Sequence, residues 1–137
     1  MSAASQQSAS SDAGKVRLRR LHAVETSGTL SWLAMDFCWM LDYSAAAVVL
    51  GLISLVSWIW SLDLVKDPAE RAANGAIVQW VLMNLIWMTA DQYDMPDLRR
   101  WAVLTALLSL AMILYSLHLA GWNFSVARFF RRFRARS

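Results

Sequence analysis

The chain has 137 residues, of which 58% are hydrophobic and only 17% are charged, with a formal net charge of +3. Soluble domains are about 45–50% apolar and about 25% charged, so this composition argues against a soluble globular protein. The single cysteine, Cys38, excludes a disulfide framework within the chain. Residues 76–90 and 101–125 carry no charged side chain. Such stretches lack the polar face of a helix on a soluble core, and we expect them to face lipid.

The first 22 residues predict a cytoplasmic tail. Residues 1–14 are rich in Ser, Ala and Gln, a composition typical of disorder. Four basic residues follow before the first apolar stretch: Lys15, Arg17, Arg19 and Arg20. No cleavable signal peptide is expected, because the apolar stretch begins late and lacks a small-residue cleavage site.

Residues 23–62 predict a first helical hairpin, with helices over about 27–41 and 45–62. Asp42-Tyr43-Ser44 is typical of a tight connection between them. The first helix is short for a membrane span, which needs roughly 20 residues. Residues 63–75 are rich in charged side chains and predict a cytoplasmic loop.

Within that loop, Asp67-Pro68 indicates the start of a helical turn. Residues 76–121 then predict a second hairpin, with helices over about 76–90 and 98–121. The aspartates and proline of 91–97 indicate a connecting loop, in which Asp97 is placed to cap the following helix. The expected fold class is therefore an all-α integral membrane protein, a bundle of four transmembrane helices.

The basic residues predict the orientation of this bundle. With the N-terminus inside, the outer loops hold only Arg99 and Arg100 of the thirteen Lys and Arg residues. Cytoplasmic segments carry an excess of Lys and Arg, so both termini are expected in the cytoplasm. A bacterial inner membrane is the default compartment.

The two hairpins resemble each other in sequence. At an offset of 48, Trp32, Trp39 and Met40 match Trp80, Trp87 and Met88. At an offset of 55, the second helices share seven identical positions, which are Ala47/Ala102, Val48/Val103, Leu52/Leu107, Ser54/Ser109, Leu55/Leu110, Ser61/Ser116 and Leu62/Leu117. We expect the longer 91–97 loop to absorb the difference in offset. Tandem duplication implies a pseudo-twofold axis along the membrane normal; chance similarity between apolar helices is the alternative.

A candidate intramembrane site lies on the first helix of each hairpin. Its residues recur at helical spacing and form two stripes, Trp32, Asp36, Trp39 and Tyr43 on one helix and Trp80, Asn84, Trp87 and Asp91 on the other. If the stripes face each other, Asp36 lies near Asn84. A carboxylate at this depth is a candidate proton or cation site beside aromatic rings. The alternative is a polar contact that holds the helices together.

Small residues follow one face of the second helix in each hairpin. They are Ala47, Gly51, Ser54 and Ser61 in the first, and Ala102, Ala106, Ser109, Ser116 and Ala120 in the second. Such residues let helix backbones approach closely. They predict helix packing, either within the bundle or in a homodimer.

The C-terminal segment 122–137 is basic and aromatic. Its arginines, which alternate with phenylalanines, are Arg128, Arg131, Arg132, Arg134 and Arg136. This pattern favours an amphipathic segment on an anionic lipid surface. Charge alone would also suit nucleic acid, but the phenylalanines favour lipid. A solvated tail that only fixes the topology is the alternative.

No pattern for a catalytic nucleophile, a phosphate loop or a metal site is present. The chain is therefore expected to be non-enzymatic, with no cofactor. The leading interpretation is a binding or accessory subunit that packs against itself or a larger membrane complex. The second interpretation is a small transporter that uses Asp36 to carry a proton or a cation.

Overall fold

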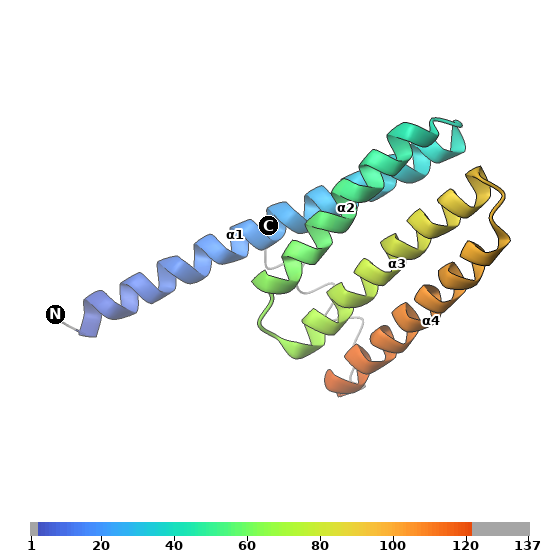
Figure 1. The fold of residues 1–137 in the computed structure, drawn as a ribbon. Helices are drawn as coiled ribbons and strands as arrows, with labels where there is room; N and C mark the ends of the chain where they lie inside the picture. The colour runs from blue at the N-terminus through green and yellow to red at the C-terminus, as the bar shows by residue number, and fades with distance from the viewer. Residues whose placement is uncertain (1–2, 122–137) are drawn as a thin grey trace.

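The described part of the chain is entirely helical. A computed structural model describes residues 3–121, with side chains described at residue 12 and from residue 14 onward. Its helices are α1 (Ala3–Met40), α2 (Ser44–Leu64), α3 (Pro68–Gln92) and α4 (Pro96–Leu119). Successive helices lie side by side and antiparallel, with α2 against α1, α3 against α2 and α4 against α3 (Figure 1). The prediction of four helices without strands is confirmed for these residues.

The helices form an open row rather than a closed bundle. The main contacts join α1 to α2, α2 to α3 and α3 to α4, and α4 makes no comparable contact with α1. Accordingly α4 buries only Ala102 and Ser109. The expected all-helical fold of two hairpins is therefore arranged as a row in which α3 joins the hairpins.

Helix α1 is much longer than the predicted 27–41. It begins at Ala3 and projects beyond the other helices at its N-terminal end (Figure 1). The structure has helix at residues 3–14, where the composition predicts disorder, and it continues through the basic residues 15–20. Ala, Gln, Arg and Leu favour helix, and no proline precedes Pro68. From His22 to Met40 the helix covers about 28 Å, so it is long enough to cross a hydrocarbon layer of about 30 Å.

Helix α3 also extends beyond the predicted 76–90. It begins at Pro68, and the Asp67 side chain accepts a hydrogen bond from the Ala69 N–H at 2.8 Å. The predicted helix start at Asp67-Pro68 is confirmed, whereas the predicted loop 63–75 shrinks to residues 65–67. The charges that suggested a loop lie near the helix end, where they reach solvent without breaking the helix.

The two hairpins are closed by the same turn. Asp42 and Asp94 each follow the end of a helix in the left-handed conformation, with φ of 61° and 47°. The next residue donates its N–H to a carbonyl five residues back, Tyr43 to Cys38 at 2.9 Å and Met95 to Ala90 at 2.8 Å. This is the Schellman pattern, and Asp tolerates the left-handed region better than most residues.

The 91–97 loop is consequently not longer than the 42–44 connection. The additional residues instead extend α3 past Met88 to Gln92 and start α4 at Pro96. The predicted cap at Asp97 is wrong: Met95 occupies the N-cap and Asp97 lies in the first turn of α4.

The core lies where α1, α2 and α3 meet. Its buried side chains are Met35, Ala47, Trp58, Val81, Leu85 and Met88. A Cβ at Gly51 would lie 3.2 Å from Leu85 Cγ and 2.8 Å from Met35 Sδ. The predicted packing role of the small residues in α2 is confirmed, because Ala47, Gly51, Ser54 and Ser61 are all buried.

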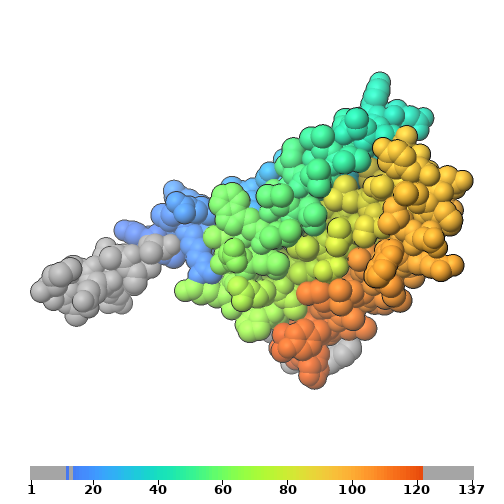
Figure 2. All heavy atoms as spheres, in the orientation of Figure 1, coloured from blue at the N-terminus to red at the C-terminus, as the bar shows by residue number. Residues whose placement is uncertain are grey.

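Two described helices, α2 and α4, are long and apolar enough to cross a membrane. Only 28% and 11% of their apolar windows are buried, whereas the core helix of a soluble protein would be mostly buried. In Figure 2, α2 (green) and α4 (orange) lie on either side of α3, with their side chains on the surface.

We predict that Gly51→Val destabilises the fold by about 1–3 kcal/mol, because the added atoms meet Leu85 and Met35 in a packed core. Thermal unfolding in mild detergent measures this change. Gly14→Val is the matched control, since no atom lies within 4 Å of a Cβ there. Equal stability of the two variants would contradict the close approach at Gly51.

Candidate functional site

The structure does not bring the two tryptophan stripes together. Trp32 and Trp39 pack against the core on α1, whereas Trp80 and Trp87 on α3 are 42% and 44% exposed. The stripes therefore have different surroundings, although they match in sequence. The reason is the open row, in which α3 covers the first hairpin and nothing described covers the second.

Asp36 lies near an end of its helix rather than in the middle. It is half-buried, and α1 continues only to Met40, about 6 Å further along the axis. Within residues 14–121, the side chains of Asp36 and Asn84 make no hydrogen bond or ion pair, so the structure shows no hydrogen bond between them.

The remaining members of the stripes lie at the hairpin turns. Tyr43 is exposed in the first turn. Asp91 accepts from Arg99 Nη2 at 3.2 Å, and the same nitrogen lies 4.0 Å from Asp94 Oδ1. Both pairs are exposed, so their contribution to stability is about 0–1 kcal/mol at most. Their position ties the end of α3 to the start of α4.

A polar network that the sequence analysis missed joins three helices. Asn74 of α3 is buried and donates to Ser61 Oγ of α2 at 3.0 Å and to Glu25 Oε1 of α1 at 3.3 Å. Ser61 in turn donates to the Trp58 carbonyl at 2.7 Å. The sequence predicts a loop over residues 63–75, which gives no sign that Asn74 lies on a buried helix face.

This network borders a cavity of about 410 Å³ between α1 and α3. The polar residues that line it are His22, Glu25, Glu70 and Asn74. Buried amide and carboxylate groups that are hydrogen-bonded to each other fix the relative position of helices. The arrangement can hold α1, α2 and α3 in register.

Serine hydroxyls link the helices within each hairpin. Ser54 donates to the Gly28 carbonyl at 2.9 Å, and Ser109 donates to the Ala76 carbonyl at 2.8 Å. The donors are 55 residues apart and the acceptors 48 residues apart, as in the sequence alignment of the hairpins. A further bond joins Ser116 to the Ala69 carbonyl at 2.8 Å.

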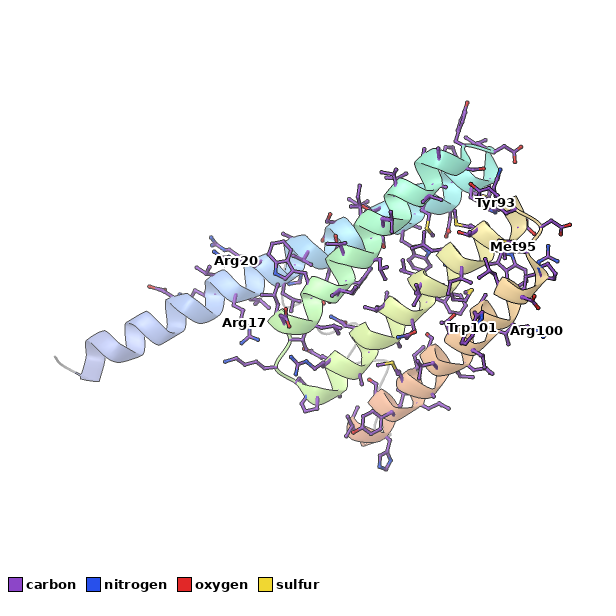
Figure 3. All side chains as sticks on the ribbon, in the orientation of Figure 1. Arg17, Arg20, Tyr93, Met95, Arg100 and Trp101 are labelled. Atoms are coloured by element: carbon purple, nitrogen blue, oxygen red, sulfur yellow. The ribbon has the colours of Figure 1, made fainter. Side chains whose placement is uncertain are left out.

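Arginines close the C-terminal end of α2, which has no basic residue in its own last turn. Arg17 Nε of α1 donates to the Leu64 carbonyl at 2.8 Å, and Arg71 Nε of α3 donates to the Leu62 carbonyl at 3.1 Å. These bonds satisfy carbonyls that a helix end leaves free. Figure 3 shows Arg17 and Arg20 at this end, and Tyr93, Met95, Arg100 and Trp101 at the opposite end.

The predicted lipid-binding arginines, Arg128, Arg131, Arg132, Arg134 and Arg136, lie outside the described residues. Comparisons with protein-family models, curated proteins and solved structures find no match to this chain.

We predict that Asn74→Ala lowers the free energy of unfolding by about 1–2 kcal/mol, because it removes both interhelical hydrogen bonds. Asn84→Ala is the matched control, and its effect should stay within about 0.5 kcal/mol. Unfolding in detergent, followed by tryptophan fluorescence, measures both variants. If Asn84→Ala lowers the free energy of unfolding more than Asn74→Ala does, the result supports the site predicted from the sequence instead.

Proposed function

We propose that the chain is an integral membrane protein crossed by all four helices, with α1 crossing through its C-terminal half. The observation that carries this proposal is the exposed apolar surface of α2 and α4, bounded by exposed aromatic residues. Tyr43 and Trp60 lie about 25 Å apart along α2, and Trp101 and Tyr115 about 21 Å apart along α4. Aromatic side chains at such separations are typical of the two membrane–water interfaces.

The charges support a cytoplasmic location for both termini, in a bacterial inner membrane. The end of the row where α2 meets α3 gathers Arg17, Arg20, Lys66 and Arg71. Arg20 also lines a groove beside Trp60, as expected for a headgroup region. The opposite end carries both hairpin turns with their aspartates, and an excess of basic residues marks the cytoplasmic side.

We further propose that the two hairpins are a tandem internal repeat. The matching Schellman turns at Asp42 and Asp94 support this relation. The equivalent bonds Ser54 to Gly28 and Ser109 to Ala76 support it independently, because their spacing follows both sequence offsets. Helices 1 and 3 are then equivalent, as are helices 2 and 4.

The function that these features support best is that of a non-enzymatic accessory or scaffold subunit. The buried hydroxyl and amide groups, Ser54, Ser61, Asn74 and Ser109, all bond to neighbouring protein groups. They therefore serve helix packing. The unpaired outer faces leave α1 and α4 available to other membrane helices.

The second candidate function is a small transporter that uses Asp36. The observation in its favour is that this carboxylate is half-buried on α1, beside the core residue Met35. Ionisable residues within spans are often part of ion or proton pathways.

We expect the protein to stay in the membrane fraction after a carbonate wash and to place both termini inside. A fluorescent reporter fused after Ser137 should be active, and alkaline phosphatase fused there should be inactive. Phosphatase inserted after Asp94 should be active. Release by carbonate would contradict membrane insertion, and an active phosphatase after Ser137 would contradict the orientation.

Asp36→Asn tests the choice between scaffold and transporter. For a scaffold we expect no proton flux into liposomes under an imposed potential, with or without the substitution, and a stability change within about 0.5 kcal/mol. Asp42→Asn is the control, because Asn also tolerates the left-handed conformation at that turn. Flux through the wild type that is lost only with Asp36→Asn would establish the transporter.

A further inference from the structure

The first hairpin has a groove between α1 and α2 that α3 fills. Leu85 of α3 lies against Gly51 of α2 and Met35 of α1. Along α3, five residues pack into this core: Ile77, Val78, Val81, Leu85 and Met88. Trp32 and Trp39 are packed against the same core.

The equivalent groove of the second hairpin, between α3 and α4, is not covered by any helix of residues 3–121. In this second groove, Trp80 and Trp87 take the positions of Trp32 and Trp39, and both are exposed. On α4, Ala106 takes the position of Gly51, and Leu110 that of Leu55. Leu110 is exposed, whereas Leu55 packs against the core.

The complementary surface is also uncovered, at the other end of the row. At the offset of 48, the larger part of this α3 face, Val78, Val81, Leu85 and Met88, corresponds to Leu30, Leu33, Phe37 and Met40 of α1, whereas Ile77 corresponds to Thr29. These four side chains form one apolar stripe of α1 and are 57–73% exposed. The chain thus carries both halves of its own internal interface, each without a described partner.

We propose that copies of this chain associate head to tail, with the α1 stripe of one copy in the α3–α4 groove of the next. The inference rests on the proposed membrane insertion and repeat. The occupant is a second copy because the contact continues the interface that the chain already forms between its hairpins. The α1 of the second copy runs antiparallel to α4, as α3 does to α2, so every copy keeps the same orientation across the membrane.

Such a contact uses two different surfaces, so it is heterologous and closes into a ring when the rotation between copies permits. A twofold dimer would instead place one surface against itself. The two arrangements therefore differ in which residues meet. The counterpart of the Gly51–Leu85 contact is Ala106 of one copy against Phe37 of the next.

Cysteine cross-linking in native membranes tests this arrangement. In a Cys38→Ala background, chains with Phe37→Cys and chains with Ala106→Cys carry different tags and are expressed together. Oxidation with copper phenanthroline should give a dimer containing both tags, several-fold above the amount from either variant alone. A Cβ added at Gly51 would lie 3.2 Å from Leu85 Cγ, so cysteines at the two equivalent positions are within reach of a disulfide.

Each other outcome overturns the proposal in a recognisable way. A dimer formed by Phe37→Cys alone indicates a twofold contact through α1, and one formed by Ala106→Cys alone indicates a twofold contact through α4. Absence of every dimer indicates that lipid covers both faces.

A matched pair of variants measures the contribution of the stripe. Phe37→Ala should lower several-fold the amount of oligomer that a bifunctional cross-linker captures. Val56→Ala, on the exposed face of α2, should leave that amount unchanged. Both side chains are similarly exposed within one chain, so neither change should affect folding. Equal effects would contradict a specific contact at Phe37.

An internal pair separates this proposal from the proposed function. Ser44 Oγ and Gln92 Oε1 lie 2.8 Å apart across the hairpin ends. Ser44→Cys with Gln92→Cys should cross-link within one chain when an impermeant bifunctional thiol reagent is added outside. If this link forms without the Phe37–Ala106 dimer, only the head-to-tail contact fails. If the internal link also fails, the membrane arrangement fails with it.

Discussion

The structure depends on the close approach of α3 to the first hairpin at Gly51. Without a side chain at this position, Leu85 can reach the groove beside Met35, and the two hairpins become one unit. Two hydrogen bonds lie near the ends of the same interface: Ser44 Oγ donates to Gln92 Oε1, and Asn74 Nδ2 donates to Ser61 Oγ. Apolar packing in the middle and polar contacts at the ends together fix the register of α2 and α3. No equivalent close approach brings α4 against a second helix, so among the described helices α4 packs mainly on α3.

The helices and their turns could be predicted because apolar stretches and turn residues are local signals. Asp42 and Pro96, for example, lie at or beside the two hairpin turns of the structure. The full lengths of α1 and α3 could not be predicted, because charged residues such as Glu70 and Arg71 indicate a loop as readily as a helix end. A charge near a helix end reaches solvent at little cost, and Ala-rich sequence without proline continues the helix. The same reasoning explains why α1 runs back to Ala3.

The candidate site was harder to predict than the helices, because its position depends on which helices pack together, and sequence spacing does not show this. Helical spacing placed Trp32 and Asp36 on one face, but it could not say what that face meets. The assumption of twofold symmetry brought Asp36 to Asn84, whereas the open row separates the environments of the two stripes. Asn74 forms the interhelical contacts instead. Its polar side chain precedes Gly75 and Ala76, and this small-residue setting is the one local signal of a close helix contact.

The open row leaves two dissimilar ends, on α1 and on α4. In the proposed membrane setting, the energetics of association at these ends depend on what replaces lipid there. Exposed leucines gain little by leaving hydrocarbon, so association depends on close packing and not on hydrophobic area. Ala106 adds a methyl group where Gly51 has none, so in the proposed assembly the equivalent contact between copies is looser than the contact within a chain. The intrachain contact also benefits from the short connection at residues 65–67, which holds α3 beside α2 at high effective concentration. A second copy must find the groove by diffusion in the bilayer. Assembly between copies should therefore vary with protein density in the membrane, while the pairing of the two hairpins within each chain should not.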